Sequence, residues 1–261
     1  MDTMEPIAVI SDIHSNHEAL SAVLHDIDQR GVKRICCLGD VVGYGPQPKE
    51  CVDLVMARCE VTIMGNHDFA TIYEPQNFNL GAEMACYWTR AQLEDEPDKA
   101  ARDRRWEFLG LLPVKLIIAA AQSPVGTVVL AHGSPRRPVN EYIFPDDTYN
   151  NPSKVGGMFD RFENLCLIGH THVPGVFLPT PEFYTPEELR GEYELEKTKA
   201  IINVGSVGQP RDRDSRASYV ILEDRRVRFV RIGYDVESTI GKVRAVKELD
   251  EYLGNRLREG R

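Results

Sequence analysis

The first 64 residues alternate short apolar runs with amphipathic stretches, and this alternation restricts the fold more than any other feature of the sequence. The runs IAVIS (7–11), RICCL (34–38) and VTIM (61–64) are rich in branched residues and predict strands. Helices are predicted between them, from about Asn16 to Gly31 and over 48–59. A β-α-β-α-β order is typical of a layered α/β domain with a parallel sheet.

The rest of the chain predicts more strands than helices. A helical stretch covers about 80–112 and is divided near Pro97, and a surface helix is predicted from about 236 to 257. Two polar stretches lack periodicity: 133–157 predicts a long loop, and 179–198 predicts an exposed insertion. No repeat or linker divides the sequence, so we expect 1–261 to form one domain. The further strands are expected at 114–120, 127–131, 164–169, 200–206, 218–224 and 226–232.

The composition argues against several classes of protein. The formal net charge of −9 disfavours non-specific binding to nucleic acid or to anionic lipid, since both need a basic surface. The sequence contains neither an apolar run of membrane-spanning length nor an N-terminal signal pattern. Six cysteines are present and none forms a C-x-x-C pair, which favours reduced thiols over disulfides. We therefore expect a cytoplasmic protein.

Polar side chains follow most of the predicted strands at the point where each strand ends. In layered α/β folds, ligands bind just beyond the carboxyl ends of the strands, because the sheet brings these ends to one edge. Five of the seven histidines of the chain stand at such positions. The strand-end residues are Asp12, His14, Asp40, Asn66, His67, Asp68, His132, His170 and His172, and Arg211 follows a later strand.

These strand-end residues offer nitrogen and oxygen ligands without a thiolate, a set that suits transition metals. Buried together without a metal ion, the same groups would leave lone pairs unsatisfied, at a cost in free energy. Two divalent cations would satisfy them, and such a centre suits an anionic substrate, above all a phosphate. The neighbouring glycines permit the sharp turns and close backbone approaches that this crowding needs. They are Gly39, Gly65, Gly133, Gly169 and Gly205.

Other interpretations apply to single residues. Each aspartate or histidine, taken alone, is also explained as a helix cap or a hydrogen-bonded polar residue. His25, on the first predicted helix, is interpreted as a surface or packing residue. His17 is interpreted in the same way, with a position facing the pocket as the alternative. Arg211 keeps two interpretations: a salt-bridge partner, or a guanidinium that binds phosphate oxygens in a bidentate manner.

Taken in order, these motifs resemble those of the calcineurin-like metallophosphoesterase superfamily. They are Asp12-x-His14, Gly39-Asp40, Gly65-Asn66-His67-Asp68, His132-Gly133 and Gly169-His170-x-His172. The stretches GDVVGYGPQP (39–48), AHGSP (131–135) and NVGSVGQPRD (203–212) are similar to the small bacterial and archaeal phosphodiesterase group. The resemblance implies a four-layer α/β/β/α sandwich of two mixed sheets with a dinuclear metal site.

The resemblance also implies a role for each residue. His67, in its protonated form, would stabilise or protonate the leaving-group oxygen, while a hydroxide that bridges the two ions attacks phosphorus in line. Asn66 would bind one of the metal ions through its uncharged amide oxygen. It is also assigned to substrate binding. One ion would be bound by Asp12, His14 and His172, the other by Asn66, His132 and His170, and Asp40 would bridge the two.

The second motif departs from that of protein phosphatases and their diadenosine-polyphosphate relatives. Those proteins carry G-D-x-x-x-R-G, whereas this chain reads GDVVGYG over 39–45 and lacks the arginine. It also lacks the acid that partners the catalytic histidine in protein phosphatases, so we do not expect protein-phosphatase activity. Asp68 is predicted to orient His67 instead, and Arg211 to supply the missing positive charge.

The sequence therefore predicts a hydrolase, a metal-dependent phosphoesterase that acts on a small phosphorylated substrate. A phosphodiester is the leading substrate class, with a dinucleoside polyphosphate or a phosphomonoester as alternatives. A non-catalytic metal-binding scaffold is a further alternative, which His67 and the complete ligand set disfavour. Mn²⁺ is the first expected ion, with Fe, Zn, Ni or Co as alternatives. The loop 133–157, with Gly156–Gly157 as its hinge, and the insertion 179–198 are predicted to select the substrate.

Overall fold

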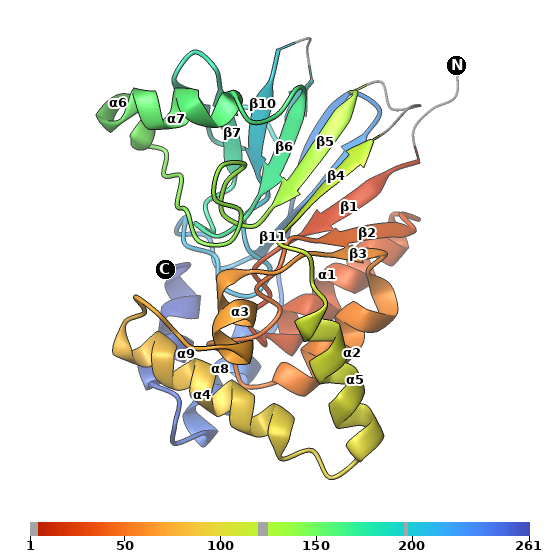
Figure 1. The fold of residues 1–261 in the computed structure, drawn as a ribbon, viewed down its shortest axis with the longest axis vertical. Coiled ribbons are helices and arrows are strands. Elements are labelled where there is room, and N and C mark those ends of the chain that lie inside the picture. The colour runs from red at the N-terminus through yellow and green to blue at the C-terminus, as the bar shows by residue number, and fades with distance from the viewer. Residues whose placement is uncertain (1–4, 120–124, 196–197) are drawn as a thin grey trace.

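Two β-sheets form the centre of the computed structural model, which describes residues 5–119, 125–195 and 198–261 (Figure 1). The strands are β1 Ile7–Ile10, β2 Arg34–Cys37, β3 Val61–Thr62, β4 Lys115–Ala119, β5 Thr127–Ala131, β6 Leu165–Ile168, β7 Gly175–Leu178, β8 Glu182–Tyr184, β9 Glu192–Glu194, β10 Ala200–Asn203, β11 Ala217–Glu223 and β12 Arg226–Ile232. The first sheet has the order β3-β2-β1-β11-β12-β9, and the second has the order β4-β5-β6-β10-β7-β8. Both sheets are mixed. In the first sheet, β1 pairs in parallel with β2 but antiparallel with β11. In the second sheet, β6 pairs in parallel with β5 and β10, whereas β4 pairs antiparallel with β5 and β7 antiparallel with β10.

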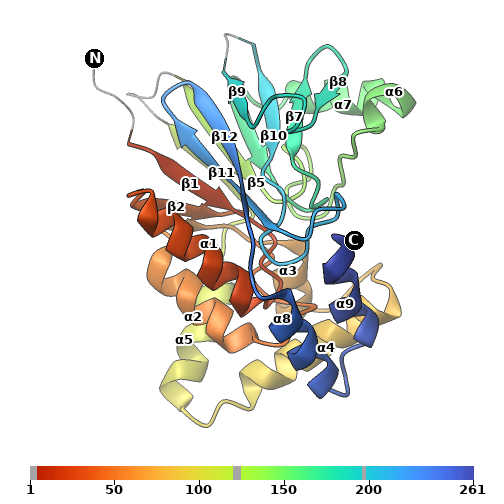
Figure 2. The ribbon, with the colours of Figure 1, turned by 180° about the vertical axis from the view of Figure 1, so that it is seen from behind.

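Helices lie outside the two sheets (Figures 1 and 2). They are α1 His17–Gln29, α2 Pro48–Arg58, α3 Asn66–Ile72, α4 Leu80–Glu94, α5 Lys99–Gly110, α6 Asp147–Asn150, α7 Pro152–Phe159, α8 Val236–Ala245, α9 Glu251–Asn255 and the 3-10 helix η1 Arg256–Glu259. Local chemistry sets several helix ends. The Asn16 side chain caps α1, as predicted, and the Asp98 side chain caps α5 just after Pro97, where the helical stretch was predicted to divide. Within the described ranges, no helix has the length and apolar character that a membrane span requires.

The buried residues of β1 show how the layers are stacked. Ala8 and Ile10 pack with α1 and α2, whereas Ile7 and Val9 pack between the two sheets. A strand that is buried on both faces needs apolar side chains at every position, which explains its continuous apolar run. The second sheet repeats this pattern: in β6, Leu167 packs between the two sheets, whereas the residues just before and after it in the sequence pack with α7. The order helix, sheet, sheet, helix confirms the predicted four-layer sandwich.

The structure corrects several predicted elements. The third strand ends at Thr62, and the short helix α3, which was not predicted, begins at Asn66. The insertion 179–198 is not irregular: β8 extends the second sheet and β9 extends the first, although residues 196–197 lie outside the described part. The strand β7 was also missed. Residue 120, at the end of a predicted strand, lies outside the described residues, and the predicted tail helix is divided into α8, α9 and η1.

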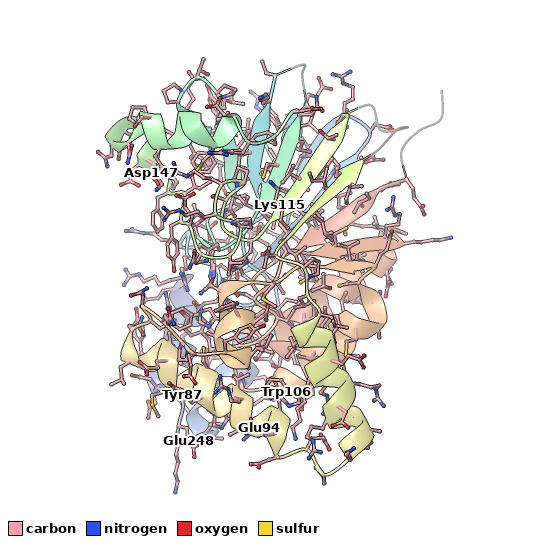
Figure 3. The ribbon with its side chains drawn as sticks, in the orientation of Figure 1. Tyr87, Glu94, Trp106, Lys115, Asp147 and Glu248 are labelled. Atoms are coloured by element: carbon pink, nitrogen blue, oxygen red, sulfur yellow. The ribbon has the colours of Figure 1, made fainter. Side chains whose placement is uncertain are left out.

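The stretch 133–157 was predicted as a loop, but its second half is helical. Asp147, labelled in Figure 3, is the first residue of α6. Its carboxylate accepts hydrogen bonds from the backbone N–H of Phe144 and from Lys154 Nζ of α7. Val155 and Phe159 of α7 are buried against the second sheet. The predicted hinge Gly156–Gly157 therefore lies inside a packed helix, which corrects the idea that it is the hinge of a loop.

Candidate metal centre

The predicted ligand residues meet where strands of both sheets end. Asp12 and His14 follow β1, Asp40 follows β2, His132 follows β5, and His170 and His172 follow β6, while Asn66 is the first residue of α3. Each of these side chains is at most 8% exposed. The structure thus brings together all seven residues that the sequence predicted as ligands.

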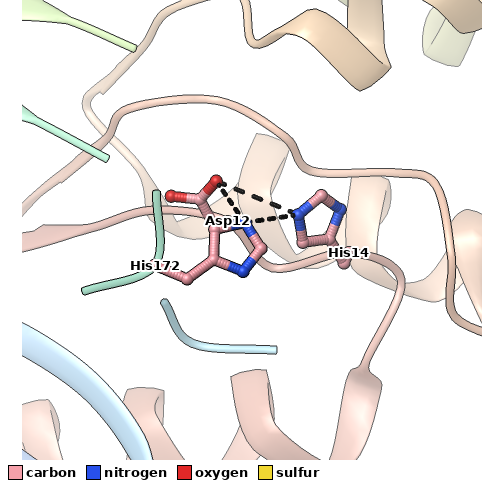
Figure 4. A group of neighbouring side chains, drawn as sticks. All are labelled: Asp12, His14 and His172. Carbon is pink, nitrogen blue, oxygen red and sulfur yellow. Dashed lines mark hydrogen bonds and ion pairs between the residues drawn. The ribbon is translucent and has the colours of Figure 1, made fainter. Parts of the chain in front are cut away.

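Asp12, His14 and His172 form the first group of candidate ligand atoms (Figure 4). The Nε2 atoms of His14 and His172 lie 3.1 Å apart. Asp12 Oδ1 lies 3.1 Å from His172 Nε2 and 3.9 Å from His14 Nε2. Three potential ligand atoms from two different sheets therefore converge on one small volume.

Asp40, His132 and His170 form a second group, with Asn66 beside it. His132 Nε2 lies 3.1 Å from Asn66 Oδ1, 3.2 Å from His170 Nδ1 and 3.3 Å from Asp40 Oδ2. Asp40 Oδ2 is also 3.6 Å from His14 Nε2, so this oxygen lies between the two groups. A further set combines His14, Asp40 and His67, so proximity alone would also admit His67 as a ligand.

Backbone carbonyls orient three of the histidine rings. The Nδ1 atom of His14 lies 3.3 Å from the carbonyl oxygen of Val42, and that of His132 lies 2.9 Å from the carbonyl oxygen of Leu38. His172 Nδ1 makes the same kind of contact with the carbonyl oxygen of Gln209. Because a carbonyl oxygen only accepts, Nδ1 carries a hydrogen, and in the neutral form of each ring Nε2 offers its lone pair to the centre.

The two carboxylates are held in the same way. One oxygen of each accepts a backbone N–H: Asp12 Oδ2 from His170 at 2.9 Å, and Asp40 Oδ1 from His67 at 2.8 Å. The other oxygen of each faces the histidine Nε2 atoms, and Asp12 Oδ1 is buried without a hydrogen-bond donor among the described residues. A buried carboxylate oxygen and facing nitrogen lone pairs are costly unless a cation lies between them, so these residues fit metal ions.

Burial and the neighbouring charges shift the pKa values in this cluster. Burial lowers the pKa of His14 and of His170, which keeps both rings neutral and able to bind a metal. For His132 the carboxylates of Asp40 and Asp12 outweigh the effect of burial and raise the pKa to about 9, so this ring would release a proton when it binds a metal ion. Burial opposes ionisation of the carboxylates themselves, but the surrounding histidines hold the pKa of Asp12 and Asp40 below the usual range.

The backbone at the site is strained. Asp12, His14, Asp40, His170 and His172 have φ values between 50° and 67°, a left-handed region that residues with a Cβ rarely adopt. Each such residue costs of order 1–3 kcal/mol, which the surrounding structure must offset. Five of the seven predicted ligands share this geometry, and strain of this kind concentrates at functional sites.

Close packing of glycine against a carboxylate leads to a first prediction. A Cβ at Gly169 would lie 2.3 Å from Asp12 Oδ2 and 2.1 Å from Ser11 Oγ. We expect Gly169→Ala to displace Asp12 and to lower metal affinity at least about tenfold, in line with other changes that disturb ligand orientation. Calorimetric titration with Mn²⁺ measures this effect. Gly156→Ala is the control, because nothing lies within 4 Å of its added Cβ, and equal affinities for the two variants would contradict the prediction.

Asp68 does not contact the ring of His67 in the way that the sequence led us to expect. Its Oδ2 accepts the backbone N–H groups of Asp40 and Gly65 at 2.8 and 3.0 Å, and its Oδ1 accepts those of Val41 and Val42 at 2.9 and 3.2 Å. The carboxylate therefore ties the loop after β2 to the start of α3. This arrangement corrects the predicted orienting role and makes Asp68 a structural support for Asp40.

His67 instead contacts a cysteine and two aromatic rings. Its Nδ1 lies 3.6 Å from Cys86 Sγ of α4, and its ring centre lies 4.3 Å from that of Tyr44 and 4.7 Å from that of Phe78. Burial lowers the pKa of His67 to about 4, and the nearby Arg211 acts in the same direction. Burial therefore favours the neutral form of this ring near pH 7 over the protonated form that the resemblance implies.

Arg211 and His17, the remaining candidates, contact other residues. Arg211 is half-buried and donates to Gln209 Oε1 at 2.7 Å, with its guanidinium carbon 5.9 Å from the centre of the Tyr44 ring. His17 Nε2 lies 3.5 Å from Ser21 Oγ, one turn further along α1, and His17 belongs to none of the three ligand groups. Tyr142, which no sequence motif singles out, stacks on His170 with ring centres 3.8 Å apart.

Comparisons with known proteins agree with this geometry. The family model described as calcineurin-like phosphoesterase matches residues 5–200. A protein of Methanocaldococcus jannaschii is 38% identical over 260 residues, which are 98% of each chain. The crystal structure of a metallophosphoesterase from Sphaerobacter thermophilus is 37% identical, covers 98% of this chain and 99% of its own, and has a TM-score of 0.80. A hypothetical protein from Pyrococcus horikoshii shares the fold at 18% identity, with 99% of each chain covered and a TM-score of 0.75. The chain belongs to the calcineurin-like phosphoesterase family.

Proposed function

We propose that this chain hydrolyses a phosphodiester bond in a small organic phosphate with the help of two divalent metal ions. The observation that carries the proposal is the position of Asp40 Oδ2, which lies 3.6 Å from His14 Nε2 of one ligand group and 3.3 Å from His132 Nε2 of the other. A single carboxylate oxygen between two groups suits a pair of adjacent cations. Mn²⁺ is the ion that we propose first.

The residues divide between the two ions according to their contacts. Asp12, His14 and His172 would hold one ion, and Asn66, His132 and His170 would hold the other, with Asp40 shared. When bound, such ions lower the pKa of a water molecule and neutralise phosphate oxygens. The chain itself supplies the fixed Nε2 lone pairs and excludes bulk water, because every ligand side chain is buried.

His67 is proposed to act on the leaving group and not as a metal ligand. Its Nδ1 is turned toward Cys86, which leaves Nε2 as the ring nitrogen available to a substrate. A hydrogen bond from Nε2–H to the departing oxygen would stabilise the negative charge that develops there. The rings of Tyr44 and Phe78 pack against the imidazole and hold it in place.

The proposal is tested with protein from which metal has been removed and to which Mn²⁺ has been added back. We expect about two ions per chain by elemental analysis, and a rise in the melting temperature on reloading, because ions that bind only the folded state stabilise it. We expect the metal-loaded protein to hydrolyse bis(p-nitrophenyl) phosphate with a higher kcat/KM than p-nitrophenyl phosphate or a dinucleoside polyphosphate. A different ranking would select one of those alternatives. Two bound ions without hydrolysis of any of these esters would favour a non-catalytic scaffold.

Arg211 is proposed to bind a phosphate oxygen of the substrate. Its guanidinium hydrogen-bonds to the neutral amide of Gln209, and its positive charge lowers the pKa of His67 and His172. We expect Arg211→Ala to raise KM for the phosphodiester about tenfold, which corresponds to one charge-assisted hydrogen bond. Steady-state kinetics measure this change. Arg211→Lys keeps the charge but not the planar donor pair, so its KM should lie between those of the wild type and of Arg211→Ala. An unchanged KM in Arg211→Ala would refute the assignment.

We propose a reducing, cytoplasmic location. Cys37, Cys51, Cys86 and Cys166 are free thiols buried in the packed interior, which is compatible with a compartment that keeps thiols reduced.

A further inference from the structure

The contact between His67 and Cys86 connects two elements that the sequence does not relate. His67 is the second residue of α3 and Cys86 lies in the middle of α4, and the two helices pack against each other. His67 Nδ1 and Cys86 Sγ are 3.6 Å apart, which is within hydrogen-bond distance for sulfur, and both side chains are at most 4% exposed. Gly43 closes the same side of the ring, since a Cβ there would lie 2.5 Å from Nδ1.

The direction of this hydrogen bond follows from the chemistry of its partners. Burial raises the pKa of the Cys86 thiol to about 12, so the sulfur keeps its hydrogen at neutral pH. An unprotonated imidazole nitrogen is a stronger acceptor than a thiol sulfur, which is a weak one. The favoured arrangement therefore has the S–H donating to Nδ1, so that the hydrogen of the neutral ring resides on Nε2.

We propose that Cys86 is a positioning residue, which donates its S–H to Nδ1 of His67 and thereby holds the ring with Nε2–H directed at the leaving-group oxygen. This inference rests on the proposed phosphodiesterase function for its catalytic consequence. An uncharged thiol suits this place, because it orients the imidazole without adding a further negative charge beside Asp40 and the other carboxylates. The contact takes the place of the Asp68 interaction that the sequence predicted.

A double-mutant cycle tests the catalytic consequence. In the Mn²⁺-loaded protein we expect Cys86→Ala to lower kcat about tenfold with KM and metal content unchanged, the size expected from one hydrogen bond. Cys86→Ser, which keeps a donor, should restore part of the loss. In a His67→Ala background, Cys86→Ala should cause no further loss, because the group that it positions is absent. Equal losses in both backgrounds would show that Cys86 acts through general packing and would overturn the proposal.

A matched control separates positioning from packing. Cys51 of α2 is also a fully buried free thiol on a helix, but it lies in the core between the first sheet and its helices. Cys51→Ala should lower the melting temperature about as much as Cys86→Ala does and leave kcat within about twofold of the wild type. A fall in kcat that is the same for both variants would contradict a specific role for Cys86.

A spectroscopic measurement tests the hydrogen bond without relying on activity. Long-range ¹H–¹⁵N spectra of the metal-free protein report which ring nitrogen of His67 carries the hydrogen. We expect Nε2–H in the wild type and a mixture of the two tautomers in Cys86→Ala. A wild-type ring with its hydrogen on Nδ1 would overturn the proposal. If the loaded wild type hydrolyses no phosphoester, the proposed function fails, whereas this spectrum still decides the assignment of Cys86.

Discussion

Replacing Asp68 with alanine is expected to destabilise the protein by at least about 4 kcal/mol, since each buried N–H group left without an acceptor costs roughly 1–3 kcal/mol. Four backbone N–H groups lose their acceptor together: those of Asp40, Val41, Val42 and Gly65. Asp40 carries the oxygen that lies between the two ligand groups, so metal binding should be lost as well. Urea unfolding of the metal-free protein and elemental analysis of the loaded protein measure the two effects.

Asp98→Ala is the matched control for Asp68→Ala. The Asp98 carboxylate also accepts two backbone N–H groups, those of Ala100 and Ala101, but it caps an exposed helix end far from the ligands in the sequence. Loss of an N-cap costs about 1 kcal/mol, and metal content should not change. If Asp68→Ala proved no more destabilising than Asp98→Ala, the carboxylate would not be the support that its contacts indicate.

Removing the ring of His67 should lower kcat by roughly 10²–10³-fold, the usual cost of losing one donor that stabilises a developing negative charge. None of the predicted ligand atoms is removed in His67→Ala, so the protein should still bind two ions. The loss should be greater for a diester with an alkyl leaving group than for one with a nitrophenyl leaving group, because a poor leaving group depends more on stabilisation of its oxygen. Steady-state kinetics with both esters provide the comparison.

The exposed His25 of α1 provides the control for this variant. His25→Ala should leave kcat and metal content unchanged, because the side chain is exposed and belongs to no ligand group. If His67→Ala lost its metal, His67 would instead be a metal ligand, in the candidate group that it forms with His14 and Asp40. Wild-type activity in a fully loaded His67→Ala variant would exclude any role of His67 in the reaction.

Three consecutive residues at the start of α3 thus contact three different parts of the structure. Asn66 Oδ1 faces His132, the ring of His67 faces Cys86, and the carboxylate of Asp68 holds the loop after β2. The start of a helix allows these three side chains to point in different directions, because successive side chains lie about 100° apart around the helix axis. A strand would have directed Asn66 and Asp68 to the same face.

Much of the architecture could be predicted because it depends on local patterns. An apolar run such as IAVIS needs burial on both faces, so β1 and its position inside a layered fold follow from the residues themselves. The grouping of the predicted ligand residues follows from the same kind of pattern, since each stands after an apolar run and the ends of neighbouring strands meet. His132 and His170 are 38 residues apart in the sequence, yet their ring nitrogens lie 3.2 Å apart because β5 and β6 are neighbours.

The sequence by itself therefore determined the layered fold, the family and which residues gather at the candidate metal centre, because these depend on residue type and on order along the chain. Only the tertiary structure decided which neighbour each functional side chain contacts. Asp68 binds four backbone N–H groups and Cys86 reaches His67 because α3 packs against α4 and against the loop after β2. Such contacts join residues that no short motif relates, and they depend on helix packing at a scale of a few ångströms, which sequence periodicity does not encode.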